Sequence, residues 1–384
     1  MILDGVGIGA LPDANEYGDV GANTLANTAR AVGGLHLPNL GRLGLGNIFP
    51  IPGVAPDKGS IGCFGKMAEQ SKAKDSTIGH WEIAGVITSK AFPLYPNGFP
   101  NDLVDRFCAA AGTGGILGNK PASGTEIIKE LGEEHVRTGY PIVYTSGDSV
   151  FQIAAHEAVI SLTRLYEICK ITRERVMVDE HRVGRIIARP FTGTSGNYTR
   201  TPNRKDFAVE APGETMLDVL SKNNVDTISI GKIDDLFSGR GLRQRIHTKS
   251  NAEGMKKIVE VGSTMDAGLL MANLVDFDML YGHRQDPKGF ALCLEEFDHK
   301  LPEIRQCLGE GDLLMITGDH GNDPTDDSTD HSREYVPILC LARGGKSGVN
   351  LGVRSSFADA GKTVADFFHV NNVLEGQSFL SLVN

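Results

Sequence analysis

The sequence predicts an α/β protein whose core is a doubly wound sheet, with a smaller α/β domain inserted into that core. From about Val225 onward, short apolar runs typical of strands alternate with longer runs of helical periodicity. This alternation favours a parallel sheet with helices on both faces. The segment from Ala91 to about Pro212 differs, because it is rich in Gly, Pro and Thr and is bracketed by turn-forming sequences. We therefore expect a core of residues 1–90 and 213–384 and a cap domain of residues 91–212.

The elements of this fold can be assigned in chain order. Met1-Ile-Leu is strand-like and leads directly to Asp4. A central strand usually has about five or six residues, so we expect this strand to be shortened at its start. The glycine-rich residues 5–9 follow, and residues 24–32 have helical spacing. The other predicted strands are 142–144, 183–188, 225–230, 269–275, 313–316 and 336–341, and the other predicted helices are 123–137, 157–170, 214–223, 250–261, 291–308 and 359–369.

Composition excludes several classes of protein. The chain of 384 residues has 38 Lys and Arg against 48 Asp and Glu, a formal charge of -10, and no basic run. This balance argues against nonspecific binding to nucleic acid or to a membrane surface, although a local basic cluster can still bind an anionic substrate. The 6 cysteines are scattered without Cys-x-x-Cys spacing, which favours reduced thiols in the cytoplasm. The sequence shows no membrane span, no secretion signal and no obligate protein partner.

The most informative stretch is Thr317-Gly-Asp-His-Gly-Asn-Asp-Pro, which is followed by Thr329-Asp-His331. It comes directly after the predicted strand 313–316, so Asp319 and His320 lie where a buried strand ends. Buried carboxylates and imidazoles must be paired or must hold a metal. Three ligand-capable residues in one loop favour a metal site. The alternative interpretation is a polar loop with incidental histidines.

Aspartates also follow two other predicted strands. Asp4 follows the first strand, and Asp276-Phe-Asp278 follows the strand 269–275, with His283 shortly after. Ligands of an open parallel sheet bind at the carboxyl ends of its strands, so these residues can share one edge. Asp276 and Asp278 lie on one face, so spacing does not choose between them, and Asp276 is alternatively a capping carboxylate. The candidate ligands of two mixed nitrogen and oxygen sites, suited to Zn or Mn, are Asp4, Asp278, His283, Asp319, His320 and His331.

A candidate nucleophile lies in Lys74-Asp-Ser-Thr-Ile-Gly-His-Trp-Glu82. Ser76 and Thr77 place two hydroxyls in a short polar loop ahead of a predicted helix. A hydroxyl is a weak nucleophile unless a base or a metal activates it. At a helix N-terminus it would also lie where backbone N–H groups favour phosphate. The alternative is a serine that only caps the helix.

Basic side chains form a third group of candidates. The guanidinium of Arg matches phosphate oxygens through paired hydrogen bonds, and Lys adds a point charge. The alternative is a solvated surface, although an Arg inside the apolar run 183–188 fits that alternative poorly. The stretch Gly5-Val-Gly-Ile-Gly9 is not the Gly-x-Gly-x-x-Gly of dinucleotide-binding loops, and we reject that reading. The basic candidates are Arg185, Arg189, Arg200, Arg204 and Lys232.

Taken together, these motifs resemble those of the phosphopentomutase family, a branch of the alkaline phosphatase superfamily, nearly from end to end. The metal motifs, among them Asp4-Gly-Val-Gly-Ile-Gly and Gly318-Asp-His-Gly-Asn-Asp-Pro, are shared across the superfamily. The pentomutase branch is indicated by Trp81-Glu-Ile, Lys120-Pro-Ala-Ser-Gly-Thr-Glu and Arg200-Thr-Pro-Asn-Arg. The resemblance implies an alkaline-phosphatase-like core with an inserted cap.

The resemblance also implies roles for individual residues. The family nucleophile is a Thr directly after Lys-Asp, which here is Ser76, and the family's second Thr is Ile78. Ser retains the hydroxyl, so we expect Ser76 to keep the role, with Thr77 as the alternative. Two Mn²⁺ ions would be bound, one by Asp278, His283 and His331 and the other by Asp4, Asp319, His320 and the nucleophile. The positions that contact the sugar phosphate in the family correspond to Asp148, Arg185, Arg200 and Lys232.

The activity implied is that of an isomerase, an intramolecular phosphotransferase of nucleoside catabolism. Phospho-Ser76 would give its phosphoryl group to a pentose monophosphate bound under the cap, forming ribose 1,5-bisphosphate. The return of the other phosphate to Ser76 would then interconvert ribose 1-phosphate and ribose 5-phosphate, and likewise the 2-deoxyribose phosphates. A sugar bisphosphate such as glucose 1,6-bisphosphate would activate the enzyme, and pentose phosphates would be its small-molecule partners.

Three alternatives compete with this interpretation. A cofactor-independent phosphoglycerate mutase also combines a Ser nucleophile, two metals and an Asp-Gly start. The context Gly79-His-Trp-Glu-Ile and the cap motifs favour the pentomutase. A metallophosphatase would be identified by net phosphate release. A catalytically inactive relative that binds a metal or a partner would have no reason to keep every ligand and nucleophile position.

Overall fold

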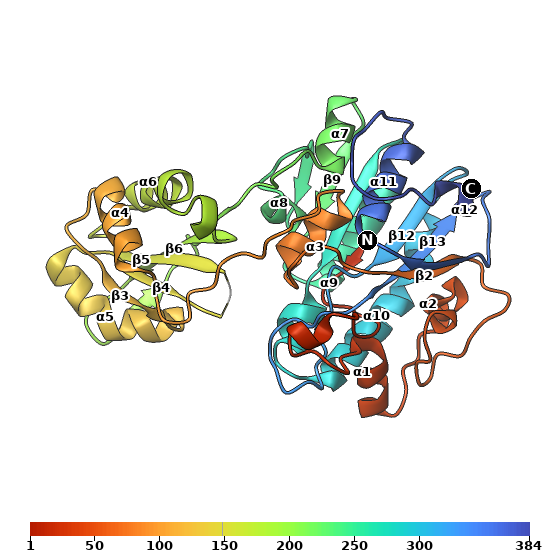
Figure 1. The fold of residues 1–384 in the computed structure, drawn as a ribbon, viewed down its shortest axis with the longest axis horizontal. Coiled ribbons are helices and arrows are strands. Elements are labelled where there is room, and N and C mark those ends of the chain that lie inside the picture. Colours follow the sequence, from red (N-terminus) through yellow and green to blue (C-terminus); the bar gives the residue numbers. More distant parts are fainter. Residues whose placement is uncertain (148) are drawn as a thin grey trace. The chain divides into compact units, whose positions relative to one another are not determined.

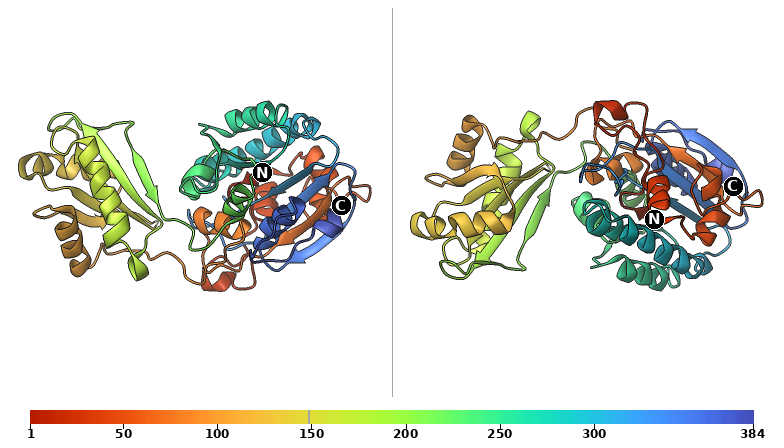
Figure 2. Two further views of the ribbon diagram at one scale, coloured as in Figure 1. Left: turned by 90° about the horizontal axis from the view of Figure 1, so that it is seen from above. Right: turned by 90° about the horizontal axis from the view of Figure 1, so that it is seen from below.

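The structure of this protein, a computed structural model, describes residues 1–147 and 149–384 and divides into two compact units (Figures 1 and 2). The core unit consists of residues 1–90 and 211–384, and the cap unit consists of residues 91–210. The chain enters the cap unit once and leaves it once, so the cap unit is an insertion into the core unit. Asp148 lies outside the described residues.

Among the described residues, the core unit is built on an eight-stranded sheet. Helices cover both of its faces (Figure 1). One layer contains α1 (Thr24–Val32), α2 (Pro38–Leu43), α9 (Asn251–Gly262) and α10 (Pro287–Gln306), and the other contains α3 (Ser76–Ile83), α7 (Met216–Lys222), α11 (Ala358–Phe367) and α12 (Leu380–Val383). The strand order is β10 (Gln244–Ile246), β9 (Thr227–Ile230), β11 (Leu269–Leu274), β1 (Ile2–Leu3), β12 (Leu313–Thr317), β13 (Val336–Ala342), β2 (Cys63–Met67) and β14 (Asn350–Arg354).

One strand departs from the parallel sheet that the sequence predicts. β13 runs antiparallel to β12 and to β2, whereas the other neighbouring strands pair in parallel. A parallel return needs a crossover, usually a helix. No helix forms between residues 318 and 335, all of which the structure describes, and the chain returns instead as an antiparallel strand. The connection is therefore a long loop, and it carries Asp319, His320 and His331.

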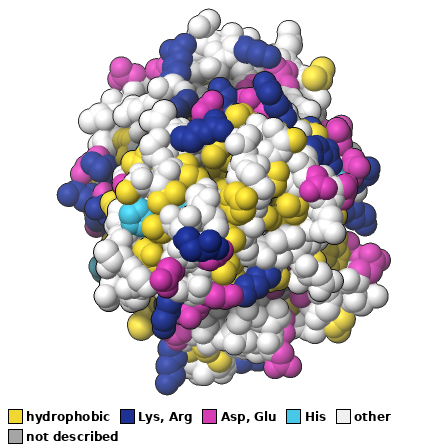
Figure 3. Space-filling model, turned by 90° about the vertical axis from the view of Figure 1, so that its left-hand side faces the viewer, with side chains coloured by type: hydrophobic (Ala, Val, Ile, Leu, Met, Phe, Trp, Pro, Cys, Tyr) yellow, Lys and Arg dark blue, Asp and Glu magenta, His cyan; other side chains and the backbone are white. Residues whose placement is uncertain are grey.

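The cap unit is a second α/β layer structure. Its sheet has the order β3 (Leu117–Pro121), β4 (Ile142–Thr145), β5 (Val150–His156), β6 (Arg185–Thr192) and β7 (Thr199–Arg200), and β8 (Lys205–Ala208) also pairs with β6. Alternate residues of each strand face opposite sides of the sheet. One face packs on α5 (Gly124–Thr138), and the other packs on α4 (Asn101–Ala111) and α6 (Leu162–Ile171). The molecular face in Figure 3 has Lys and Arg side chains interspersed with Asp and Glu.

Several element boundaries differ from those predicted, for local reasons. The helix expected to start at residue 157 starts at Leu162, because residues 157–160 form a turn and Ser161 caps the helix by accepting from Arg164 N. The helix expected to start at residue 291 already starts at Pro287. Its polar first turn hides the apolar periodicity, although Pro at the first position and the cap Asp286 are typical of a helix start. None of the described helices is both long and apolar enough to span a membrane.

Candidate metal centre and nucleophile

Three aspartates of the core unit lie at one edge of the sheet, because the strands that precede them, β11, β1 and β12, are neighbours. Asp4 directly follows β1, and Asp319 lies just beyond the end of β12. Asp278 lies after β11 in the short π-helix η5 (Phe277–Gly282). All three carboxylates are at least nine-tenths buried, with exposed fractions of 2%, 0% and 6% for Asp4, Asp319 and Asp278. The carboxyl ends of three parallel strands thus place buried negative charge at one edge.

The first cluster consists of Asp278, His283 and His331. Nε2 of His283 lies 3.2 Å from Oδ2 of Asp278, and Nε2 of His331 lies 3.3 Å from Oδ1. The two Nε2 atoms are 3.2 Å apart. Two ring nitrogens and one carboxylate therefore converge on a single point.

The backbone fixes which nitrogen of each ring faces this point. Nδ1 of His283 lies 2.7 Å from the carbonyl oxygen of Thr329, and Nδ1 of His331 lies 2.8 Å from that of Lys74. A carbonyl oxygen only accepts, so each Nδ1 carries the proton and each Nε2 of a neutral ring carries a lone pair. Lone pairs that face one another and a carboxylate repel unless a cation lies between them. This is the arrangement that orients histidines as metal ligands.

The pKa shifts in this cluster show that its carboxylate favours nearby positive charge. The hydrogen bond to Asp278 raises the pKa of His283 to about 9, in spite of burial. Burial alone would raise the pKa of Asp278, but His331 and His283 hold it well below its usual range. Without a metal, a proton on His283 supplies positive charge beside the carboxylate of Asp278.

The second cluster consists of Asp4, Asp319 and His320, with Ser76 beside it. Nε2 of His320 lies 3.3 Å from Oδ1 of Asp4 and 3.4 Å from Oδ2 of Asp319. Its Nδ1 lies 3.0 Å from the carbonyl oxygen of Gly321, so the Nε2 lone pair again faces the carboxylates. The Oγ of Ser76 is 3.0 Å from this Nε2 and 3.5 Å from Oδ1 of Asp4. The hydroxyl is thus a further ligand-capable atom of the second cluster.

Both clusters fit metal ions by the chemistry of their donors. In each, the three ligand atoms lie within 4.8 Å of one another. Oδ2 of Asp319 is buried and accepts no hydrogen bond of regular geometry, although Nδ1 of His80 lies 3.0 Å away. An unpartnered buried carboxylate oxygen is costly unless a cation satisfies it. Mixed histidine and carboxylate donors suit Mn or Zn better than Mg or Ca.

The two clusters adjoin through their histidine rings. The rings of His320 and His331 stack with a centroid distance of 3.9 Å, and those of His283 and His331 lie 4.8 Å apart. His320 belongs to the second cluster and His331 to the first, yet both come from the loop between β12 and β13. One loop therefore connects two candidate sites.

Ser76 is the first residue of α3, and Asp75 is the cap of that helix, accepting a hydrogen bond of 3.1 Å from Ile78 N. The interpretation of Ser76 as the cap is therefore wrong. Its hydroxyl remains free to face the second cluster at the positive end of the helix dipole. Gly79 lets the helix approach this cluster, because a Cβ atom there would lie 2.1 Å from the carbonyl oxygen of Asp319.

Three polar residues that sequence reasoning missed hold these ligands in place. His80 donates from Nδ1 to the carbonyl oxygen of Ser76 at 2.7 Å. The side-chain amide of Asn273 donates to Oδ2 of Asp4 at 2.9 Å and faces Nε2 of His80 at 3.2 Å. Asn322 donates to Oδ1 of Asp278 at 2.7 Å. Their only signal in the sequence was their position, since His80 and Asn322 lie inside the quoted motifs and Asn273 lies in the predicted strand 269–275.

Asp276 has a different role from Asp278. Its Oδ2 accepts a hydrogen bond of 2.7 Å from the backbone of Asn251, the first residue of α9, and its own backbone donates to Oδ1 of Asn251 at 3.0 Å. Asp276 therefore ties the end of β11 to the start of a helix. This corresponds to the capping alternative, and it leaves Asp278 to the metal cluster.

Arg333 fixes the segment that leads to Ser76. Its guanidinium is 2% exposed and lies 2.7 Å from Oε2 of Glu69. It also donates to the carbonyl oxygens of Ser71 at 2.8 Å and Ala73 at 2.6 Å. A buried guanidinium with carbonyl and carboxylate acceptors on one segment holds that segment rigidly. The backbone before the nucleophile is thus positioned from the same loop that provides His331.

The predicted phosphate-binding residues lie in both units. Arg185 begins β6 in the cap unit and lies 3.7 Å from Asp206, and Arg200 is exposed at the end of β7. Lys232 is exposed in the core unit, directly before α8 (Ile233–Leu236). Asp148 lies outside the described residues.

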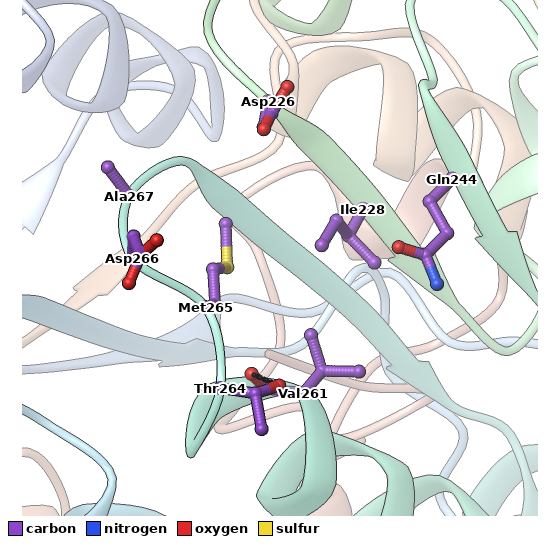
Figure 4. Close-up of a pocket in the computed structure, with 8 residues that line it drawn as sticks. All are labelled: Asp226, Ile228, Gln244, Val261, Thr264, Met265, Asp266 and Ala267. Atoms are coloured by element: carbon purple, nitrogen blue, oxygen red, sulfur yellow. Dashed lines mark hydrogen bonds between the residues drawn. The ribbon is translucent and has the colours of Figure 1, made fainter.

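Two cavities of the described core unit lie away from the clusters. One, of about 320 Å³, is lined by residues at the starts of β9 and β11, including Asp226 and Asp266 (Figure 4). The other, also about 320 Å³, is mainly apolar and lies beside Met1 and the starts of β11 and β12. Both are at the amino ends of strands, whereas the metal ligands are at the carboxyl ends. Neither cavity contains a candidate ligand.

Comparison with known proteins assigns the family. The metalloenzyme superfamily profile matches residues 1–372. The chain is 58% identical to a phosphopentomutase of Dictyoglomus thermophilum, over 100% of this chain and 97% of that protein. It is 55% identical to one of Acetivibrio thermocellus, over 100% and 98%. A phosphoglycerate mutase structure from Leishmania mexicana has a TM-score of 0.50 at 12% identity, covering 100% of this chain and 96% of that one, so it shares the fold alone. The expected alkaline-phosphatase-like fold is confirmed, and the chain belongs to the phosphopentomutase family of isomerases within the metalloenzyme superfamily.

Proposed function

We propose that this enzyme interconverts ribose 1-phosphate and ribose 5-phosphate, and the corresponding 2-deoxyribose phosphates, through a phosphorylated Ser76 and a pentose 1,5-bisphosphate. The observation that carries this proposal is the position of the Ser76 hydroxyl, 3.0 Å from Nε2 of His320 and 3.5 Å from Oδ1 of Asp4. The names of the curated relatives support the substrate class.

In the proposed reaction, phospho-Ser76 meets a pentose monophosphate that carries a free hydroxyl. The bond from Ser76 Oγ to phosphorus breaks while the bond from the sugar oxygen to phosphorus forms, and the proton of the sugar hydroxyl passes to Ser76 Oγ. The bisphosphate then presents its other phosphate, which returns to Ser76 in the reverse sense. Such a transfer depends mainly on alignment of the reacting atoms and on neutralisation of charge.

The residues of the two clusters divide this work. Asp278, His283 and His331 would hold one Mn²⁺, and Asp4, Asp319 and His320 would hold the other. When bound, the ions would act as Lewis acids that offset the negative charge on the phosphoryl oxygens and favour the alkoxide of the serine. Asn273 and Asn322 keep the carboxylates oriented, and Arg333 keeps the segment before Ser76 fixed. The start of α3 adds the positive end of a helix dipole where the phosphate must lie.

We assign binding of the sugar phosphate to the cap unit, with Arg185 and Arg200, and to Lys232 of the core unit. Asp148 belongs to the same proposed set. Guanidinium and ammonium groups that are exposed can reach the oxygens of a phosphate monoester. A sugar bisphosphate such as glucose 1,6-bisphosphate would first phosphorylate Ser76. The 6 cysteines are free thiols in the described structure, which supports a cytoplasmic location.

The test is a coupled assay with ribose 1-phosphate, Mn²⁺ and a catalytic amount of glucose 1,6-bisphosphate. We expect ribose 5-phosphate to form without net release of phosphate. Parallel assays with 3-phosphoglycerate address the mutase alternative, and phosphate release addresses the phosphatase alternative. Conversion of 3-phosphoglycerate, or phosphate release at the rate of substrate loss, would contradict the proposal.

A further inference from the structure

A buried carboxylate that the proposed reaction does not use lies at the end of the loop between β12 and β13. Glu334 comes shortly after His331 on this loop, and it is 1% exposed. Among the described residues, it forms no ion pair with a cation. Burial raises the pKa of Glu334 to about 7, although the hydrogen bonds that it accepts oppose that rise. A buried carboxylate is costly in free energy, so this position needs an explanation.

Glu334 accepts hydrogen bonds from three segments of the core unit. Its Oε2 accepts from the backbone of Gly9 at 3.0 Å and from that of Thr24 at 2.9 Å. Its Oε1 accepts from the hydroxyls of Thr24 and Ser332, both at 2.7 Å. Four donors around one carboxylate favour its ionised form. The loop after β1, the start of α1 and the loop between β12 and β13 therefore meet at one side chain.

The hydroxyl of Thr24 connects Glu334 to the first metal cluster. A hydroxyl has one proton and an ionised carboxylate only accepts, so this hydroxyl donates to Glu334 and accepts elsewhere. Its Oγ1 accepts a hydrogen bond of 3.0 Å from the backbone of Asn322. The side chain of Asn322 in turn donates to Oδ1 of Asp278 at 2.7 Å. The carboxylate of Glu334 thus acts on a candidate metal ligand through two intervening residues.

The hydroxyl of Ser332 connects the same carboxylate to the loop that carries two histidine ligands. Ser332 directly follows His331, and its Oγ accepts a hydrogen bond of 3.3 Å from the backbone of Asp323. Its backbone exchanges two hydrogen bonds, of 2.8 and 3.1 Å, with Gly321, which directly follows His320. The two ends of the loop are therefore joined beside the carboxylate.

Two glycines make room for this carboxylate. A Cβ atom at Gly7 would overlap Oε2 of Glu334, and one at Gly321 would overlap Oε1. Gly7 and Gly9 belong to Gly5-Val-Gly-Ile-Gly9, the stretch that does not fit a dinucleotide-binding loop. Glycine lets the backbone approach an anion closely. The anion at this glycine-rich loop is a carboxylate of the same chain.

We propose that Glu334 is a positioning residue of the metal centre, which orients Asp278 through Thr24 and Asn322 before a metal binds. Through Ser332 it also holds the two ends of the ligand loop together. The inference rests on the proposed function, because that function assigns a metal ion to the cluster of Asp278. Replacing a hydrogen-bonding partner of a metal ligand typically lowers metal affinity by about 10–100-fold.

The test compares the Mn²⁺ affinity of full-length Glu334→Gln with that of full-length Asp298→Asn, by calorimetry at about pH 8. Glutamine keeps the shape of glutamate, but its NH₂ group faces either two N–H groups or two hydroxyls that already accept from the loop. Asp298 is a matched control, because it is a carboxylate of 2% exposure that accepts from the backbone of Leu40 at 2.7 Å and joins α10 to α2. We expect Mn²⁺ binding to weaken about tenfold or more in Glu334→Gln and to stay within about twofold in Asp298→Asn. Equal affinities in the two variants would overturn the inference.

A second pair of variants leaves Glu334 in place. Thr24→Val removes the hydroxyl and keeps the shape of the side chain, whereas Thr24→Ser keeps the hydroxyl. We expect Thr24→Val to weaken Mn²⁺ binding and Thr24→Ser to match the wild type, and this pair decides alone if Glu334→Gln does not fold. A lower free energy of unfolding in Thr24→Val with unchanged Mn²⁺ affinity would mean a purely structural role and would contradict the inference.

These affinities separate the inference from the proposed function. If the wild type binds Mn²⁺ but converts no ribose 1-phosphate, the proposed function fails and the affinities still decide on Glu334. If the enzyme converts ribose 1-phosphate and Glu334→Gln binds Mn²⁺ as the wild type does, the role of Glu334 is refuted while the proposed function stands. A wild type that binds no Mn²⁺ would refute the role of Glu334 together with the metal assignment.

Discussion

At the scale of single residues, the hydroxyl of Ser76 and the lone pairs of three histidines have one feature in common: a neighbouring backbone or side-chain group fixes their orientation. His283, His320 and His331 each direct Nδ1 at a carbonyl oxygen, which leaves Nε2 for the cluster. Ser76 is kept in place by α3 and by His80. The reactive and ligand-capable atoms of the site are therefore oriented before a substrate binds.

Replacing Ser76 by Ala should reduce phosphoryl transfer by more than about 10³-fold, because the acceptor atom of the phosphoryl group is removed. Circular dichroism should show an unchanged fold. Ser76→Thr should keep activity, since threonine supplies the same hydroxyl group. Thr77→Val tests the neighbouring hydroxyl. Full activity of Ser76→Ala together with loss in Thr77→Val would transfer the role to Thr77.

Metal binding should depend on pH through His283. Its pKa of about 9 in the metal-free protein means that it is protonated at pH 7, so a metal must displace that proton. We expect Mn²⁺ affinity to rise as pH increases from 7 towards 9, with proton release on binding. Calorimetry in buffers of different ionisation enthalpy measures this release. An affinity that is constant over that range would contradict the assignment of His283 as a ligand.

Sequence reasoning predicted single residues of the site less completely than it predicted the elements. Aspartates that follow apolar runs were recognisable, because a buried strand that ends in a carboxylate is unusual. His80, Asn273 and Asn322 were not, since a polar residue inside a motif does not reveal which atom it faces. The same limit left Asp276 and Asp278 as equals until α9 was seen to begin at Asn251.

At the scale of elements, α3 is positioned by its contact with the backbone of the loop that follows β12. Gly79→Ala would place a Cβ atom 2.1 Å from the carbonyl oxygen of Asp319. We expect about 1–3 kcal/mol of destabilisation from this overlap and a loss of metal affinity as Asp319 moves. The matched control is Gly41→Ala in α2, where the nearest atom to the new Cβ is 3.7 Å away. Urea unfolding of both variants measures the difference, and equal stabilities would contradict the tight packing of α3.

The segment before α3 depends on Arg333 in a comparable way. Arg333→Leu should cost about 3–5 kcal/mol, because it leaves the buried Glu69 without its partner. Glu69→Gln combined with Arg333→Leu should recover part of that loss, since it removes the unpaired charge. A double-mutant cycle by urea unfolding gives the coupling. Strictly additive effects would mean that the ion pair does not hold this segment.

Elements with clear apolar periodicity were predicted well, and α1 starts and ends at the residues expected. Two of the strands that were missed, β10 and β14, are short and lie at the two edges of the core sheet, and their polar and exposed residues give no alternation. The strands β2 and β5 were missed as well, although most of their residues are buried. The direction of β13 could not be predicted either, because it depends on the absence of a crossover helix in the preceding loop.

At the scale of the whole molecule, the chain combines a core unit that contains both candidate metal clusters with a cap unit that carries Arg185 and Arg200. The overall charge of -10 argues against general polyanion binding, but it does not show how the basic side chains are distributed over the two units. Sequence reasoning identified the ligand-capable side chains that the fold brings together in the core unit, but not the hydrogen bonds from His80, Asn273 and Asn322 that hold them.

We propose that Ser76 carries the phosphoryl group between the two positions of the pentose. The most direct measurement is mass spectrometry of the peptide that contains Ser76 after incubation with Mn²⁺ and glucose 1,6-bisphosphate, followed by a single addition of ribose 1-phosphate. We expect phosphate on Ser76 before the addition, and its transfer to the sugar as ribose 1,5-bisphosphate afterwards. Turnover of ribose 1-phosphate by an enzyme that never carries phosphate on Ser76 would contradict the account.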